Sequence, residues 1–282
     1  MNKFDDFNSM LRQDDTMFHY TKGSVVLENI LFTKQFRYSS LNNTNDPREY
    51  KYWFYGAHGY GGLSSNKDLD KKRRIAGQKL DRIRRFDFKV GGFCSNRLAL
   101  TDTSINNDTE NCDTKLDNIL GYAKPRMWSQ YGENHYGICL AFSIQCMVEA
   151  IKNQLGNKAI FFHHKVEYSN AIPYNVISLD ANDLIEKDDS NIFALNHIKK
   201  CYKEVFFIKH TDYKDEDEFR FIIYYPTEEY FYLDISTCIL AVIVGDRFHE
   251  IYTPLIEQFC STFNVEYRRL SWNHGEPALL LR

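Results

Sequence analysis

The stretch Asp215-Glu216-Asp217-Glu218-Phe219-Arg220-Phe221-Ile222-Ile223-Tyr224-Tyr225 joins four acidic residues to an apolar segment that contains one arginine. Its aromatic and β-branched residues favour a strand over 218–225. Residues two apart in a strand share a face, so Glu216 and Glu218 are expected on one side. The pair either shares a ligand or belongs to an acidic loop before an edge strand. Arg220, opposite Phe219, is expected to meet a substrate phosphate or to pair with Asp46 or Glu49.

The composition indicates an ordered globular protein with a single domain over 1–282. Hydrophobic residues make up 43% of the chain and aromatic residues 15%, which is enough to build a large core rich in rings. Two segments are expected to stand apart from this core. One is a basic helical insertion at about 64–88, and the other is a polar loop at about 96–118, a candidate lid.

The seven cysteines include no C-x-x-C pair, which argues against a disulfide framework or a zinc site. We therefore expect a reducing compartment and no metal. The first residues lack the basic start and apolar stretch of a signal peptide, and the apolar run 238–245 is too short to cross a bilayer. These features predict a cytoplasmic protein without membrane association.

The net charge of −3 gives no general attraction to nucleic acid, but the basic residues are concentrated. From Lys67 to Lys89, ten Lys or Arg stand against four Asp. Such a helix face can bind a phosphate backbone, although a solvated helix of mixed charge has the same composition. The side chains proposed to contact nucleic acid are Arg73, Arg74, Arg84 and Arg85.

Short apolar runs alternate with amphipathic segments, which predicts an α+β fold with a mostly antiparallel mixed sheet and flanking helices. Ser24 is expected to cap the first helix. Strands are predicted over 17–20, 35–39, 88–95, 136–142, 158–168, 218–225, around 231, 238–244 and 265–270. Helices are predicted over 24–32, 69–86, 144–155 and 249–263, and a further long helix is expected within 183–208.

Four spaced pieces of sequence resemble the bacterial family known as domain of unknown function 2971. They are His19-Tyr20-Thr21, then Ser39-Ser40 with Asn45-Asp46-Pro47-Arg48-Glu49, then Trp128-x-x-Tyr131-x-x-x-His135-x-Gly137, and Glu216-x-Glu218-Phe219-Arg220. The resemblance extends from His19 to Gly245. It departs at Thr44, where the family usually has an aromatic residue, and at Tyr213, where it usually has Trp.

The order of these pieces is similar to that of ADP-ribosyltransferases, which carry a first-strand His or Arg, a second-strand Ser-Thr-Ser or Tyr, and a late Glu. This resemblance implies a related fold, NAD as the substrate, and transfer of ADP-ribose to a protein or nucleic acid, or hydrolysis of NAD. It implies that Glu218 stabilises an oxocarbenium-like sugar, that His19 fixes the ribose, and that Glu216 activates the acceptor unless it is a loop carboxylate. The residues implied to bind NAD are Tyr20, Thr21, Tyr38, Ser39, Arg220 and Tyr131.

We therefore expect His19 and Glu218 to line one cleft, on the same side of the sheet, with imidazole and carboxylate about 10 Å apart. Placement on opposite sides of the sheet would count against the transferase hypothesis. Two other functions stay open. One is a non-catalytic module of the same fold that binds a nucleotide or a peptide in an aromatic cleft. The other is a metal-dependent nuclease-like protein that uses Asp46, Glu49, Glu216 and Glu218. Trp128, Tyr131 and His135 fit either a pocket wall or core packing.

Overall fold

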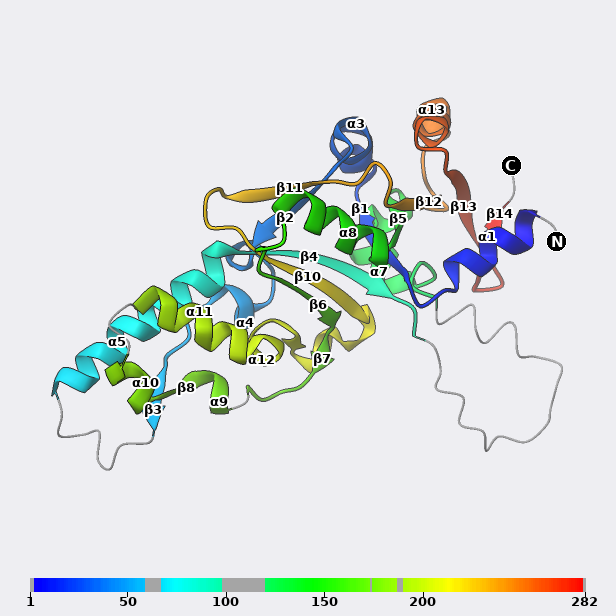
Figure 1. The fold of residues 1–282 in the computed structure, drawn as a ribbon. Coiled ribbons are helices and arrows are strands. Elements are labelled where there is room, and N and C mark those ends of the chain that lie inside the picture. Colours follow the sequence, from blue (N-terminus) through cyan, green and yellow to red (C-terminus); the bar gives the residue numbers. More distant parts are fainter. Residues whose placement is uncertain (1–2, 59–66, 98–119, 173, 187–189, 281–282) are drawn as a thin grey trace.

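A mixed sheet of ten strands occupies the centre of the structure, a computed structural model that describes residues 3–58, 67–97, 120–172, 174–186 and 190–280. The strand order is β11-β2-β4-β1-β5-β12-β13-β14, and β10 followed by β6 adds to the other edge of β4 (Figure 1). In this sheet β12 and β13 run parallel and the remaining described pairs run antiparallel. The strands are β1 (Thr16–Thr21), β2 (Gln35–Ser40), β4 (Phe88–Ser95), β5 (Ile138–Ser143), β6 (Phe161–Lys165), β10 (Glu218–Tyr224), β11 (Tyr230–Asp234), β12 (Ile239–Val244), β13 (Glu266–Asn273) and β14 (Glu276–Leu280).

Helices cover both faces of this sheet. One face packs against the helical segment that links β1 to β2, against α8 and against α13, in a core rich in Phe, Ile and Leu (Figure 1). The opposite face packs against α1 and α7. The helical segments are α1 (Lys3–Leu11), α2 (Gly23–Val25), η1 (Val26–Ile30), α3 (Leu31–Thr33), α7 (Pro125–Gln130), η5 (Glu133–His135), α8 (Ile144–Leu155), η7 (Glu250–Tyr252) and α13 (Thr253–Phe263).

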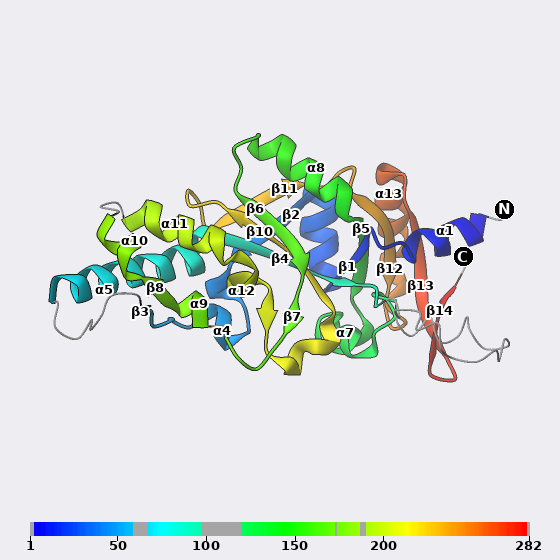
Figure 2. The same ribbon diagram turned by 60° about the horizontal axis from the view of Figure 1, so that its bottom comes forward.

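A helical lobe extends from the sheet at the end remote from both termini (Figure 2). It has its own apolar cluster, which also takes in Phe88 and Ile222 from the main sheet. The lobe consists of β3 (Gly56–His58), α5 (Lys67–Arg82), η4 (Ile83–Asp87), α9 (Tyr174–Ile177), β8 (Ser178–Asp180), α10 (Ala181–Glu186), α11 (Ser190–Lys200) and α12 (Tyr202–Phe206). Short connecting elements are η2 (Leu41–Asn43), α4 (Pro47–Tyr50), β7 (Glu167–Tyr168), β9 (Ile208–Lys209) and η6 (Thr211–Glu216).

The predicted fold class is confirmed at the level of an α+β protein with a mixed, mostly antiparallel sheet and flanking helices. The strand over 88–95 and the helix over 144–155 agree with the structure at both ends. Within the described residues, no helix combines the length and the apolar composition needed to cross a bilayer. Residues 98–118 of the predicted lid lie outside the described part of the chain.

The stretch 183–208 contains a long helix, as predicted: this helix is α11, and Cys201, with φ −115° and ψ 24°, separates it from α12. Three other predictions about individual elements were wrong. The strand over 158–168 is two strands, β6 and β7. The last predicted strand continues to Asn273 and turns back as β14, which was not predicted.

Ser24 does not cap the predicted helix over 24–32. The helix begins at Gly23, with Lys22 in the capping position. The Gly23 amide donates a hydrogen bond to the Glu133 carboxylate at 3.2 Å, so a residue far along the chain satisfies this helix end. A cap supplied by tertiary structure cannot be found from local sequence.

Candidate functional site

A pocket of about 400 Å³ opens where the sheet is split. One edge of β4 pairs with β2 at residues 89–90 and with β1 at residues 94–95, so residues 91–93 have no strand partner there. The other edge of β4 pairs with β10 throughout 88–94. The residues predicted for the site that line this pocket are His19, Tyr20, Ser39, Tyr131, Glu216, Glu218 and Arg220.

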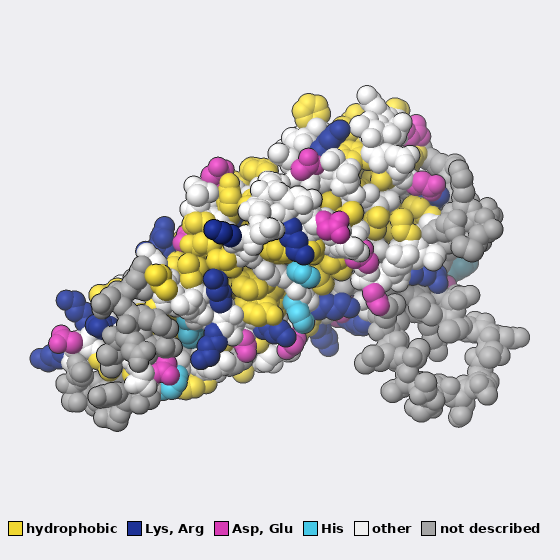
Figure 3. Space-filling model, in the orientation of Figure 1, with side chains coloured by type: hydrophobic (Ala, Val, Ile, Leu, Met, Phe, Trp, Pro, Cys, Tyr) yellow, Lys and Arg dark blue, Asp and Glu magenta, His cyan; other side chains and the backbone are white. Residues whose placement is uncertain are grey.

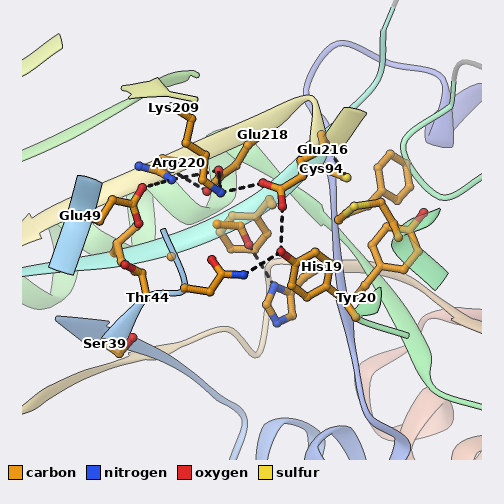
Figure 4. A pocket seen from close by; sticks show the side chains of 18 of the residues that line it. His19, Tyr20, Ser39, Thr44, Glu49, Cys94, Lys209, Glu216, Glu218 and Arg220 are labelled. Atoms are coloured by element: carbon orange, nitrogen blue, oxygen red, sulfur yellow. Dashed lines mark hydrogen bonds and ion pairs between the residues drawn. The ribbon is translucent and has the colours of Figure 1, made fainter. Parts of the chain in front are cut away.

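Five buried charged side chains form a chain along the floor of this pocket: Glu49, Arg220, Glu218, Lys209 and Glu216 (Figure 4). Arg220 contacts Glu49 and donates two hydrogen bonds to Glu218, from Nε at 2.7 Å and from Nη2 at 3.0 Å. Lys209 Nζ donates to Glu216 at 2.7 Å and lies 3.0 Å from Glu218. Three carboxylates and two cations leave this charge chain with one net negative charge.

Glu218 is an ionised carboxylate in this setting. Burial would raise its pKa, but the attraction of Arg220 and Lys209 outweighs burial and lowers the pKa. Burial likewise opposes the charge on both cations, and the attraction of Glu218 nevertheless raises the pKa of Lys209 and of Arg220. Glu218 can therefore stabilise a positive charge at neutral pH, but it cannot donate a proton.

The two glutamates of the acidic run are buried and do not belong to a solvated loop. Glu216 and Glu218 are 7% and 8% exposed, and both face Lys209. Between them Asp217 has φ 44°, which turns the chain from η6 into β10 and directs its own carboxylate toward Arg97, at 2.9 Å. The sequence left open whether Arg220 pairs with Asp46 or with Glu49, and in the structure it pairs with Glu49.

Lys209 was missed by the sequence analysis. It ends the apolar run Phe206-Phe207-Ile208, and its Nζ lies 4.6 Å from the centre of the Tyr213 ring. A lysine directly after three apolar residues is a usable signal, because a buried lysine needs carboxylate partners. The acidic run provides those partners.

Tyr131 links the charge chain to the loop after β2. Its hydroxyl donates to Glu216 Oε1 at 2.7 Å and accepts a hydrogen bond from Asn45 at 3.3 Å. Burial, together with the neighbouring Glu216 charge, raises the Tyr131 pKa, so the phenol stays protonated. Tyr20 is also committed within the protein, since its hydroxyl donates to the Gly121 carbonyl at 2.6 Å.

His19 and Glu218 line the same pocket, but they leave the sheet on opposite faces. The His19 ring packs against Phe36 and Phe93, with ring centres 4.8 and 5.6 Å apart, in the core covered by α8. Glu218 lies opposite Cys94 in the β4–β10 pairing, on the other face of the sheet. The prediction that the two side chains line one cleft is confirmed, and the prediction that they lie on the same side of the sheet is wrong. The split in the sheet lets side chains from opposite faces reach one pocket.

The hydrogen bond of His19 fixes its chemical form. Nδ1 lies 3.0 Å from the Gly92 carbonyl, which only accepts, so Nδ1 carries the hydrogen. Burial lowers the His19 pKa, and the bond to Gly92 opposes this shift. A neutral ring of this tautomer offers Nε2 as an acceptor, suited to a ligand hydroxyl.

The two glycines of β4 leave room for the site. A Cβ at Gly91 would lie 2.4 Å from the Tyr38 ring, and a Cβ at Gly92 would lie 2.6 Å from the Glu218 carboxylate. The neighbouring Cys94 is no nucleophile at neutral pH, because burial raises its pKa to about 12 and its thiol donates to the Glu216 carbonyl.

Two residues implied to bind NAD are not among those lining the pocket, namely Thr21 and Tyr38. Thr21 ends β1, opposite Ile138. Tyr38 is fully buried in the core beneath Gly91. Trp128 is likewise core, and its indole donates to the Tyr122 carbonyl at 2.7 Å.

The proposed nucleic-acid face on α5 and η4 needs correction. Arg84 is fully buried, donates to three backbone carbonyls and to Asp81, and stacks on Trp53 at 4.2 Å. Side-chain exposure is 14% for Arg73, 20% for Arg85 and 64% for Arg74. On the side of the molecule drawn in Figure 3, the coloured Lys and Arg side chains are scattered among Asp and Glu.

The four carboxylates of the nuclease-like hypothesis do not form a metal site. Glu49 and Glu218 share Arg220, Glu216 binds Lys209, and Asp46 caps α4 by accepting from the Arg48 amide at 2.9 Å. In the described part of the chain, no three His, Cys, Asp or Glu side chains are placed to hold a metal ion.

Residues 127–221 are similar to a family described as "Protein of unknown function (DUF2971)". The match covers about a third of the chain and includes Tyr131 and the charged residues from Lys209 to Arg220, but it excludes His19. No curated protein and no solved structure matches the chain. The resemblance to ADP-ribosyltransferases gains no support from these comparisons.

Proposed function

We propose that the chain is an enzyme that cleaves the bond between nicotinamide and ribose in NAD and either transfers ADP-ribose to a macromolecule or hydrolyses NAD. The supporting observation is the charge distribution of the pocket. Its floor has one net negative charge, with Glu218 ionised, while Arg37 is exposed and also lines the pocket. NAD combines a cationic nicotinamide ring with an anionic diphosphate. The negative floor suits the ring, and Arg37 suits the diphosphate.

In this proposal the floor stabilises the positive charge that develops on the sugar as nicotinamide leaves. Glu218 supplies the nearest fixed negative charge, and His19 Nε2 accepts from a ribose hydroxyl. Arg37 binds the diphosphate at the rim of the pocket. Glu216 receives the proton of the attacking macromolecular acceptor, a role that requires a ligand to displace Tyr131 or Lys209.

The acceptor is a protein or a nucleic acid. For a nucleic acid, the proposed contacts are Lys71, Lys72 and Arg74, three of the exposed cations of α5, so that only Arg74 is kept from the four arginines expected from sequence. Charge reversal at these three positions should then weaken oligonucleotide binding at low salt without changing NAD affinity.

A non-catalytic nucleotide-binding module is the second candidate, and two observations favour it. Both oxygens of Glu218 are already engaged by Arg220, with Lys209 beside them, and His19 approaches from the opposite face. A carboxylate in this state resembles a structural ion pair more than a free catalytic group.

The deciding experiment incubates the pure protein with NAD, with and without cell lysate, and measures released nicotinamide and NAD binding. The enzyme proposal expects turnover that falls at least about a hundredfold in Glu218→Gln, measured per folded molecule. Arg268→Met is the control, because it removes a mostly buried partner of Glu266 in β13, a strand that contributes no lining residue to the pocket. Saturable NAD binding without turnover supports the binding module, and absence of NAD binding rejects the enzyme proposal.

Glu216→Gln separates transfer from hydrolysis. If Glu216 activates the acceptor, transfer to lysate components is lost while nicotinamide release from NAD alone continues. Equal loss of both activities, with the folded fraction unchanged, contradicts this role.

A further inference from the structure

A second pocket, of about 390 Å³, lies between the start of the helix after β1, the loop around η5 and the segment after β12. It is lined by aromatic rings and carboxylates, and it shares no lining residue with the pocket at the split. Neither the charge chain nor the proposed chemistry uses it.

Its rings form a connected row. Tyr136 and His249 have ring centres 5.1 Å apart, His249 and Tyr252 6.5 Å, and Phe248 and Tyr252 6.1 Å. Phe248 is buried and anchors the row, while Tyr136 and Tyr252 are 39% and 46% exposed. These rings therefore present their surfaces to a ligand rather than to the core.

Two carboxylates complete the pocket, on Glu28 and Glu133. Glu133 accepts the hydrogen bond from the Gly23 amide through Oε2. No Lys or Arg of the described residues lies within ion-pair distance of Glu28 or Glu133. The negative charge of this pocket is thus not balanced from within the protein.

The loop that bears Glu133 and Tyr136 is held in place. Glu133, Asn134 and His135 have φ of 54°, 52° and 72°, three left-handed residues in succession. Gly245 packs so closely that a Cβ there would lie 2.0 Å from the His135 carbonyl oxygen, and His135 also contacts Asp246 at 3.1 Å. Side chains on such a constrained loop are set in position before a ligand arrives.

We propose that this pocket binds an organic ammonium group. Aromatic faces attract a cation through their quadrupole, and weakly hydrated alkylated ammonium ions gain most from this contact. Two unbalanced carboxylates add Coulombic attraction and disfavour an anion or a neutral apolar ligand. The ammonium can be a free small molecule or the end of a lysine side chain in a polypeptide.

The test measures binding of tetramethylammonium to the full chain by calorimetry or protein NMR, with tert-butanol as a neutral compound of similar shape. Tetramethylammonium should saturate the site, and tert-butanol should bind at least about tenfold more weakly. Tyr252→Leu, which keeps apolar volume, should weaken tetramethylammonium binding at least about fivefold. Glu133→Gln, which keeps an acceptor for Gly23, should weaken it about threefold or more.

Tyr174→Leu and Glu167→Gln are the matched controls, since both residues are exposed outside this pocket and should leave binding unchanged. Equal binding of tert-butanol, equal losses in the controls, or no saturable binding of tetramethylammonium overturns the proposal. A lysine-containing peptide and its norleucine twin distinguish the two sources. Preference for the lysine peptide over free tetramethylammonium assigns the site to polypeptides, and the reverse order assigns it to small ammonium compounds.

Discussion

The Glu218 carboxylate accepts two hydrogen bonds from Arg220 and lies 3.0 Å from Lys209. A solvated glutamate at the mouth of a strand is expected to contribute little to stability. The burial of Glu218 between two cations changes that expectation, because removal of one partner leaves the remaining buried charges unbalanced.

Glu218→Gln should therefore lower the free energy of unfolding by about 3 kcal/mol, as expected for a broken buried ion pair. Urea denaturation at neutral pH measures the change, and the exposed Glu167→Gln provides the baseline. A loss no larger than that of Glu167→Gln would show that Arg220 is satisfied by Glu49 and the Phe206 carbonyl alone.

His19 gives a prediction about pH. Because burial lowers its pKa in the folded state, the unfolded chain binds the proton more readily. The stabilisation from neutral His19 is complete above the unfolded pKa of about 6.5 and is lost as pH falls below it. Unfolding free energies between about pH 7 and 5 should fall more steeply in the wild type than in His19→Asn.

His163 also has a lowered pKa, caused first by burial, so His19→Asn should reduce the slope without abolishing it. An identical slope in the variant would mean that His19 titrates alike in the folded and unfolded states.

At the scale of elements, α5 and η4 contain arginines of two kinds. Arg84→Met should cost about 3–5 kcal/mol, because Asp81 and three carbonyls lose a fully buried partner. Arg74→Met should cost less than about 0.5 kcal/mol, because Arg74 is 64% exposed and its ion pair with Asp70 is long, at 3.8 Å. Urea midpoints of the two variants test the difference, and similar midpoints would contradict it.

Elements were predictable where the spacing of apolar residues along the sequence follows the buried face of the helix or strand. The helix over 144–155 has a cap from Ser143 and an apolar face with Met147 and Ile151, and its bounds are correct. The charge distribution along α5 and η4 did not reveal that Arg84 is buried, because the acceptors of Arg84 are carbonyls of a distant segment, Arg48 to Lys51.

The site was predictable in part for a similar reason. Spacing brought Glu216, Glu218 and Arg220 together, since all three lie within one segment. Lys209 and the split beside Gly91 depend on how distant strands pair, which no local pattern encodes. The prediction that His19 lies on the same side of the sheet as Glu218 was wrong, because a split sheet lets residues from both faces reach one pocket.

At the scale of the molecule, the helical lobe and the sheet share one apolar cluster, which includes Phe88 and Ile222. We expect them to unfold together as the single domain that the sequence predicts. Trp53 packs against the lobe cluster, while Trp128 and Trp272 belong to the cluster under α1 and α7.

Two double variants test this prediction. Trp128→Phe with Trp272→Phe leaves Trp53 as the reporter, and Trp53→Phe with Trp272→Phe leaves Trp128. In each, the urea midpoint from fluorescence should equal the midpoint from far-UV circular dichroism. A fluorescence midpoint for Trp53 below that of circular dichroism would show that the lobe unfolds first.

The glycine pair of β4 also constrains how the protein can change. Gly91 is closed by Tyr38 on one face and Gly92 by Glu218 on the other, so a side chain at either position collides with a residue that is itself fixed. Epistasis should therefore connect position 92 with position 218: a side chain at 92 is tolerated only after residue 218 has become smaller. A variant library that samples single substitutions will find position 92 immutable, whereas one that varies both positions together can reach other pocket chemistries.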